Sequence, residues 1–176
     1  MISERMNGMA FVKKELKDLA VNPFTTIGDE WFLLTAGTPE NYNTMTASWG
    51  AMGVIWGGPA MTAVVRTSRH TFGYMEENDT FTVCVFPEEY RKALQFCGSH
   101  SGRDFDKAKE TGLTPVELDG TTVFAEAKLV LICEKMYAQM MGEEHFTQPE
   151  ICEKWYGTDP MHKMYIGRIK AAYVQE

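Results

Sequence analysis

The clearest pattern in the chain is a regular alternation of apolar and polar residues over short segments. Between residues 80 and 86, Phe81, Val83 and Val85 alternate with two threonines and a cysteine. Such alternation is typical of a β-strand with one buried face. Similar alternation, or short apolar runs, predicts further strands over residues 31–35, 44–50, 52–56, 61–66, 121–137 and 164–174.

Fewer segments have the periodicity of helices. Between residues 8 and 20, Phe11 or Val12 falls on one face with Leu16 and Leu19, whereas the lysines fall elsewhere. This amphipathic pattern predicts an N-terminal helix within residues 1–20. Shorter helices are expected over residues 72–78, from Pro87 to a stop at Gly98, and from Asp104 or Asp106 to Gly112. We expect residues 97–102 to form a loop and residues 141–158 to be rich in loops.

Many short strands separated by few helices favour a mainly β fold, a barrel of antiparallel strands with helical insertions. No repeat of 20–50 residues and no linker occurs in the sequence, so a single domain over residues 1–176 is expected. Of its 176 residues, 44% are hydrophobic and 23% are charged, which is ordinary for a soluble globular protein.

The charge and the terminal sequence exclude several classes of protein. A net charge of −7 argues against a nucleic-acid surface, which would need clustered lysine and arginine. No apolar run approaches the roughly 20 residues that a membrane span requires, and the first residues lack the apolar centre of a signal peptide. We therefore expect a cytoplasmic protein with no nucleic-acid or membrane partner. The cysteines, Cys84, Cys97, Cys133 and Cys152, form no C-x-x-C pair and are expected to be thiols without a metal.

Motifs of the common nucleotide and hydrolase folds do not occur in the sequence. It has no G-x-G-x-x-G, no Walker A sequence and no G-x-S-x-G. Its adjacent glutamates are typical of solvated surface. We therefore assign no catalytic side chain and no metal ligand.

Two stretches carry the residue types that a nucleotide-like cofactor requires. The segment 44–50 ends in small and hydroxyl-bearing residues, beside which a flat ring fits closely. A basic, hydroxyl-rich turn follows segment 61–66 and opens a short helix, and its guanidinium, hydroxyl and amide groups are suited to phosphate. The candidates are Thr46, Ala47, Ser48 and Trp49 for the ring, and Arg66, Ser68, Arg69, His70 and Thr71 for the phosphate.

Taken from the residues alone, a structural role for these positions stays open. Arg66 and Arg69 would then pair with surface acids, and Ser68 would only cap the helix that follows. Residues 46–49 would be part of an ordinary alternating strand.

The order and spacing of several motifs resemble the flavin reductase-like, FMN-binding split-barrel family, to which the flavoredoxins belong. The resemblance covers most of the chain from about residue 22 onward. The motifs are Thr46-Ala47-Ser48-Trp49-Gly50, Arg66-Thr67-Ser68-Arg69-His70-Thr71, Tyr90-Arg91-Lys92-Ala93, Phe96-Cys97-Gly98-Ser99-His100-Ser101-Gly102-Arg103-Asp104, Asp106-Lys107, Thr111-Gly112-Leu113-Thr114-Pro115, Leu131-Ile132-Cys133 and His162-Lys163-Met164-Tyr165-Ile166-Gly167.

The resemblance implies a six-stranded antiparallel split barrel and a homodimer that holds FMN near its interface. It places the ring against residues 46–49 and the phosphate and ribityl chain against the 66–71 turn. It further implies that the segment 97–104 closes over the ring, through Cys97, Gly98, Ser99, Ser101 and Gly102, with Asp104 supporting that segment. His70 and His100 replace the tyrosine and lysine expected in close relatives.

The function implied is an FMN-dependent oxidoreductase that passes electrons from NAD(P)H or a reduced partner protein through FMN. The alternative is a flavoredoxin-type electron-transfer protein without NAD(P)H activity of its own. A scaffold without flavin and a pyridoxamine-phosphate-oxidase-like enzyme are less well supported. His162 and Cys97 are further candidates near the ring, although a structural role is favoured for both.

Overall fold

The computed structural model describes the backbone of residues 4–6 and 9–176 and the side chains from residue 11 onward. The described strands of the main sheet are nine, and every neighbouring pair is antiparallel. They are β1 (Glu4–Met6), β2 (Met9–Lys14), β3 (Phe32–Thr38), β4 (Asn41–Ala47), β5 (Gly50–Ile55), β6 (Gly58–Arg66), β7 (Thr80–Val85), β10 (Leu129–Met140) and β11 (His162–Gln175). A small hairpin, β8 (Pro115–Leu118) with β9 (Thr121–Phe124), stands apart from this sheet.

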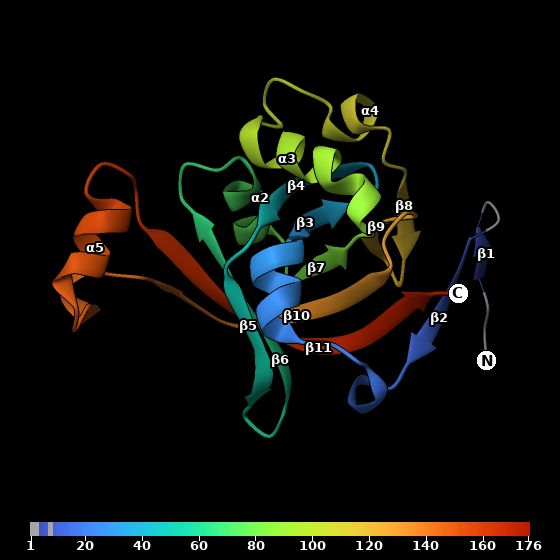
Figure 1. Ribbon diagram of the computed structural model, residues 1–176, viewed down its shortest axis with the longest axis horizontal. Coiled ribbons are helices and arrows are strands. Elements are labelled where there is room, and N and C mark those ends of the chain that lie inside the picture. Colours follow the sequence, from blue (N-terminus) through green and yellow to red (C-terminus); the bar gives the residue numbers. More distant parts are fainter. Residues whose placement is uncertain (1–3, 7–8) are drawn as a thin grey trace.

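Short helices connect the strands and cover parts of the sheet (Figure 1). The α-helices are α1 (Pro23–Thr25), α2 (Thr71–Glu77), α3 (Arg91–Ser99), α4 (Lys107–Thr111) and α5 (Pro149–Tyr156). Single turns of other helix types lie at η1 (Leu16–Asp18), η2 (Thr26–Glu30), η3 (Glu88–Tyr90) and η4 (Glu143–His145). No helix in the described part of the chain is long and apolar enough to cross a membrane.

The strand β11 organises the sheet because different parts of it pair with different neighbours. Its first half pairs with β6, its last residues pair with β2, and β10 runs beside it along nearly its whole length. From β10 the sheet continues through β7 and β3 to β4. The end of β10 and the start of β11 extend away from the sheet and carry α5 at a distance from the other helices (Figure 1). We call residues 141–161, between these two strands, the arm.

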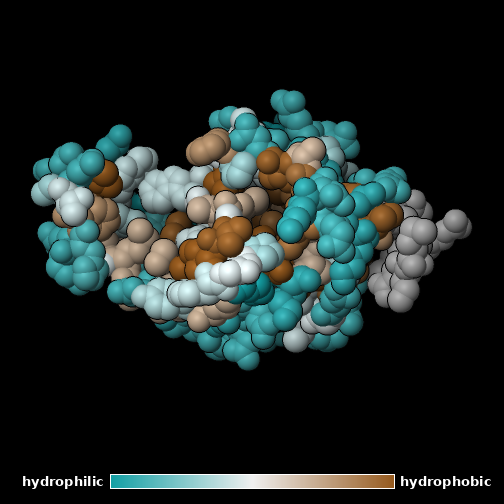
Figure 2. All heavy atoms as spheres, turned by 90° about the horizontal axis from the view of Figure 1, so that it is seen from below, coloured by the Kyte–Doolittle hydropathy of each residue, from teal (hydrophilic) through white to brown (hydrophobic). Residues whose placement is uncertain are grey.

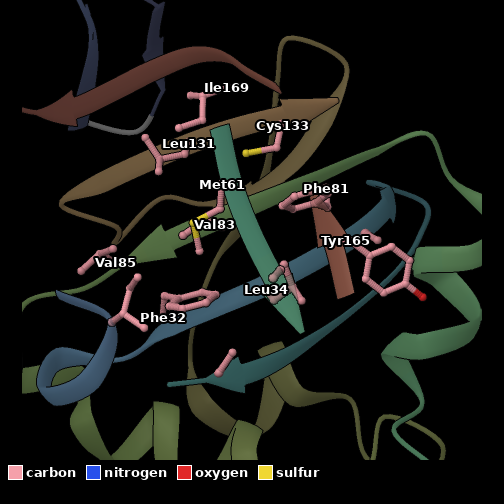
Figure 3. Close-up of a cluster of buried hydrophobic side chains, with 14 of the residues drawn as sticks. Phe32, Leu34, Met61, Phe81, Val83, Val85, Leu131, Cys133, Tyr165 and Ile169 are labelled. Atoms are coloured by element: carbon pink, nitrogen blue, oxygen red, sulfur yellow. The ribbon is translucent and has the colours of Figure 1, made fainter. Parts of the chain in front are cut away.

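Alternation along the central strands places side chains in two apolar clusters, one on each face. Phe32 and Leu34 of β3 belong to the first cluster, whereas Leu33 belongs to the second. Figure 3 shows the first cluster, in which side chains from β3, β6, β7, β10 and β11 point toward one another. The second cluster lies against α3 and the β8–β9 hairpin and includes Leu94 and Phe124. Central strands are thus buried on both faces, which explains their nearly continuous apolar sequences.

The mainly β, antiparallel fold with helical insertions is confirmed, and four local predictions are corrected. The predicted N-terminal helix is wrong over residues 9–14, which form β2; Gly8 lies outside the described residues. Pairing of β2 with the end of β11 outweighs the helical periodicity. Leu16 and Leu19 nevertheless pack against the first cluster, as apolar residues of an amphipathic segment should.

The predicted strand over residues 121–137 is interrupted. Strand β9 ends at Phe124 and β10 begins at Leu129. In the turn between them, the Glu126 carboxylate accepts hydrogen bonds of 3.0 Å from the Thr114 N–H. A buried carboxylate with a backbone partner thus occupies a position that the apolar pattern assigned to a strand.

The remaining two corrections concern expected loops. Helix α3 continues through Gly98 to Ser99, so the predicted stop at Gly98 is wrong and only residues 100–102 of the expected loop lie outside the helix. The stretch 141–158 contains the eight-residue helix α5, which has Pro149 in its first turn, where proline costs no hydrogen bond.

Candidate functional site

The end of β4 forms a wall shared by two surface hollows. Thr46, Ala47 and Ser48 line both of them. The wall is held from behind, because Ala47 pairs with Phe32 in the adjacent strand β3. From the front, the Thr46 hydroxyl donates to the Leu94 carbonyl of α3. The predicted ring-binding segment therefore has small side chains and a fixed backbone.

The first hollow has a volume of about 190 Å³ and is basic and aromatic. Besides the shared wall, Trp49, Arg66, Arg69 and His162 line it. The structure thus brings the predicted ring segment and both predicted phosphate arginines to one place, although they come from β4, β6 and the turn after β6.

The second hollow, of about 450 Å³, lies between the shared wall and α3. Gly98 and Ser99, both predicted, line it together with Leu94 and Gln95. Trp31 completes the lining from the other side. This tryptophan has a positive φ of 67°, a strained conformation for a residue other than glycine, and its ring packs 4.2 Å from the Arg91 guanidinium.

Arg66 reaches from the first hollow to the arm. Its guanidinium donates to the carbonyls of Trp155 and Pro160, at 3.2 and 3.3 Å, and lies 3.4 Å from the Asp159 carboxylate. It also faces the Tyr156 ring at 5.4 Å. Pairing with an acid, one of the structural alternatives considered for Arg66, is therefore present.

Arg69 makes different contacts, because its guanidinium binds the end of α3. It donates to the Gly98 carbonyl at 2.6 Å and to the Cys97 carbonyl at 3.3 Å. Lys107 donates to the same Cys97 carbonyl at 2.8 Å and to the Thr44 carbonyl at 2.8 Å. Two cations thus satisfy the last carbonyls of α3, which explains how the helix continues past its glycine.

His162 lies buried in the wall of the first hollow. Its Nδ1 is 2.9 Å from the Tyr156 hydroxyl, and its ring lies 5.2 Å from the ring of Trp49. Burial, followed by the nearby Arg66 charge, lowers the His162 pKa to about 4. The imidazole is therefore neutral at pH 7. The Trp49 ring also meets Trp155 edge-on at 4.8 Å, so the arm contributes to the same aromatic group.

Cys97 is completely buried in α3 and its side chain faces the second apolar cluster. Burial raises its pKa to about 11, so it remains a thiol at neutral pH. All four cysteines are free thiols and all are buried. The Cys97 side chain therefore has a packing role, and its carbonyl accepts hydrogen bonds from Arg69 and Lys107.

Other predicted residues lie next to the two hollows and do not line them. Thr71 is buried and its hydroxyl accepts a hydrogen bond of 2.7 Å from the Asn43 amide. Ser68 is exposed in the turn, and His70, at the start of α2, has its pKa lowered by burial and by the charges of Arg103 and Lys107.

The segment after α3 packs on the other side of this turn. A Cβ at Gly102 would lie 1.9 Å from Oδ1 of Asn43, so a larger residue there would require the Asn43 side chain to move. Ser101 accepts at its hydroxyl from the Arg103 N–H, and its carbonyl accepts from the Asp104 N–H at 3.1 Å. Backbone contacts of Ser101 and Asp104 therefore shape this segment, and the supporting role of the Asp104 side chain stays a prediction.

Sequence reasoning gave no role to several residues of the site. The sequence predicts Trp31 only as the start of a strand, and Lys107 lies in a motif to which we assign no function. The arm residues Trp155 and Tyr156 lie in a stretch expected to be loop. The sequence signal for Lys107 is its position directly after Asp106, the residue that caps α4. The Asp106 side chain accepts a hydrogen bond from the Lys109 N–H.

Comparisons with known proteins point to one family. A family model described as a flavin reductase like domain matches residues 25–176. No curated protein matches the chain. At 17% identity, the chain is similar to the FMN-binding domain of a flavin reductases-like enzyme from Shewanella baltica OS155, with a TM-score of 0.66 and coverage of 99% of this chain and 79% of that chain.

Two further solved structures share the fold. Flavoredoxin of Desulfovibrio vulgaris (Miyazaki F) has 19% identity and a TM-score of 0.66, with coverage of 94% of this chain and 78% of that chain. An NADH:FAD oxidoreductase from Streptomyces globisporus C-1027 has 19% identity and a TM-score of 0.60, with coverage of 84% and 78%. These likenesses show the fold of the chain.

Proposed function

Because the chain belongs to the flavin reductase-like domain family, we propose that it binds FMN and acts as an oxidoreductase that passes electrons through it. The donor in this proposal is NAD(P)H or a reduced partner protein. The names of its structural relatives, an FMN-binding domain, a flavoredoxin and an NADH:FAD oxidoreductase, agree with this proposal.

The residues around the end of β4 fit the parts of FMN. The small side chains of Thr46, Ala47 and Ser48 leave backbone groups accessible to a flat ring, and both hollows open beside them. A Cβ at Gly98 would lie 3.4 Å from the Thr46 Cβ, so a larger residue there would reduce the space in front of this wall. Arg66 supplies a cation suited to the phosphate. The observation that carries the proposal is this combination of a small-residue wall and a guanidinium group around one strand end.

When bound, FMN supplies the redox chemistry, because its ring accepts electrons and passes them on. The residues of the chain hold the ring and shield it from water. The Trp49 ring lines one side of the first hollow, and the Trp155 ring packs against it. Neutral His162 adds no charge beside them at pH 7. Placement and electrostatics are thus the contributions that we assign to the protein.

An anaerobic titration tests the proposed activity. Protein loaded with FMN should lose its flavin absorbance within seconds to minutes of NADH or NADPH addition. If neither nucleotide bleaches the flavin while dithionite does, NAD(P)H is not the donor, and the flavoredoxin-type alternative without NAD(P)H activity is favoured.

The contact between Arg66 and the arm leads to a prediction for Asp159. Its carboxylate is exposed (62%) and lies 3.4 Å from the group that we assign to the FMN phosphate. Exposed ion pairs contribute about 0–1 kcal/mol. Asp159→Asn should therefore raise FMN affinity by up to about fivefold, measured by flavin fluorescence. Glu150→Gln, another arm acid, is the control; a lower affinity in Asp159→Asn would show that the carboxylate does not compete with phosphate.

We further infer that the chain forms a homodimer and that β4, β3, β7, β10, β11 and β6 make its six-stranded split barrel. Strand β5 extends this series and, among the described strands, pairs with β6. Residues 50–55 carry no charge, and Val54 is 74% exposed. An exposed apolar edge strand of this kind favours association. Figure 2, seen from the side toward which the β5–β6 hairpin projects, shows apolar side chains gathered on this face.

A charge on this edge tests the dimer. Val54→Lys should shift the protein toward monomer in sedimentation at micromolar concentration, whereas Lys92→Ala should leave its mass unchanged. Sedimentation of the unmutated protein as a monomer would contradict the dimer.

A further inference from the structure

Lys107 is a buried cation next to the candidate FMN site. Its side chain, on the first residue of α4, is only 5% exposed. The ammonium donates to two backbone carbonyls, those of Thr44 and Cys97. Among the residues that the structure describes, no carboxylate lies within ion-pair distance of its Nζ. Lysines are rarely buried to this degree without a counter-ion.

The two carbonyls belong to the two elements that enclose the second hollow. Thr44 precedes the Thr46 wall by two residues on β4, and Cys97 immediately precedes Gly98 on α3. Lys107 therefore joins these two elements, and it lines a separate, neighbouring hollow with Thr44 and Gly102. Arg69 shares the Cys97 carbonyl, which places a second cation beside the first.

Two adjacent cations with carbonyl partners leave positive charge that an anion would neutralise. Burial, followed by the charge of Arg69, lowers the Lys107 pKa to about 8. The nearby Cys97 thiol does not supply the anion, since its own pKa is raised to about 11. The direction of the Lys107 shift shows that its charged form is disfavoured until negative charge approaches it.

We propose that Lys107 is a positioning residue that joins β4 to α3 and places a positive charge next to the ring-binding segment, so that the site binds reduced FMN in preference to oxidised FMN. This inference rests on the proposed FMN binding. Uptake of two electrons and one proton leaves the previously neutral ring with one negative charge. That added charge is the one that a buried ammonium next to the ring-binding segment stabilises.

The midpoint potential of the bound FMN tests the proposal, with dithionite as the source of electrons. Lys107→Gln keeps hydrogen-bond donors and removes the charge. It should reduce the preference for reduced over oxidised FMN at least about tenfold, a fall of about 30 mV for a two-electron couple. Lys107→Arg keeps the charge and should stay within about threefold of the unmutated protein. Lys109→Gln, which removes an exposed lysine from the same helix, is the matched control.

The outcomes separate this proposal from the proposed function. An unchanged potential in Lys107→Gln, or an equal fall in Lys107→Gln and Lys107→Arg, would overturn the role of the charge while FMN binding itself stands. Failure of the unmutated protein to bind FMN would instead overturn the proposed function. If Lys107→Gln does not fold, Lys107→Met, which also lacks the charge, is measured in the same way.

Discussion

Replacing Arg66 with alanine should lower the affinity of the protein for FMN about 10- to 150-fold. A hydrogen bond to a charged group contributes about 1.5–3 kcal/mol, and this range corresponds to the expected loss. Arg66 lies in the first hollow beside the ring segment, and its contacts with Trp155 and Pro160 hold the guanidinium in place before phosphate arrives. Fluorescence titration with FMN measures the change.

The prediction concerns Arg66 more than Arg69 because the two guanidinium groups have different partners. Both groups donate to two carbonyls, but those that Arg69 binds belong to the end of α3, which packs on β4. Burial also lowers the pKa of Arg69. Arg66 instead has Asp159 as an exposed partner that a phosphate is able to replace. Arg69→Ala should therefore weaken folding as well as binding.

Two control variants and one alternative ligand sharpen the Arg66 experiment. Arg66→Lys should recover part of the affinity, since it keeps the charge and loses the planar fork. Lys92→Ala removes an exposed cation from α3 and should have no effect. Riboflavin, which has no phosphate, should bind equally well to the unmutated protein and to Arg66→Ala. An FMN affinity for Arg66→Ala equal to that of the unmutated protein would remove Arg66 from the phosphate site.

The largest expected effect on stability belongs to Phe32. Its side chain is completely buried (0% exposed) in the first cluster, and its backbone pairs with Ala47 of the site wall. Truncation of a buried phenylalanine to alanine costs about 3–5 kcal/mol. Phe32→Ala should therefore lose about that much free energy of unfolding, measured by urea denaturation monitored by circular dichroism.

Phe24 supplies the matched control for this substitution. It is 87% exposed, so Phe24→Ala removes the same atoms from the surface. Its free energy of unfolding should stay within about 0.5 kcal/mol of the unmutated value. A loss of less than 1 kcal/mol in Phe32→Ala would show that the first cluster is not packed as described.

Apolar residues located the central strands, although the alternation over residues 80–86, typical of one buried face, did not indicate that Thr82 and Cys84 are buried as well. Alternation over residues 80–86 became β7, and the apolar run 31–35 became the core of β3. Capping chemistry was equally informative: Asp106 caps α4, and Gly112 ends it with a positive φ of 73°. These strands and helix ends depend on residues close to one another in the sequence, so a local pattern predicts them.

Features that depend on distant partners could not be predicted in this way. Residues 9–14 have a helical pattern and become a strand because the end of β11 offers an edge to pair with. Helix α3 passes Gly98 because Arg69, from another part of the chain, satisfies its last carbonyls. The arm approaches the site only because β10 and β11 both extend beyond the sheet.

The candidate site was predictable in the residues that carry a recognisable chemistry. Small residues at 46–48 and the arginines at 66 and 69 were identified by type, and the structure places them around shared hollows. The Thr71 hydroxyl was predicted to bind the phosphate, but in the structure it accepts a hydrogen bond from Asn43. Lys107 was left without a role because its importance comes from burial between two elements, and sequence does not report burial of a lysine.

Flavin absorbance of the protein after incubation with FMN and removal of free ligand tests the central claim most directly. We predict a retained flavin band at a ratio of one FMN per chain, with riboflavin retained less well because it lacks the phosphate. A colourless protein after FMN addition would contradict the account, since the wall at 46–48 and the cations beside it would then hold no flavin.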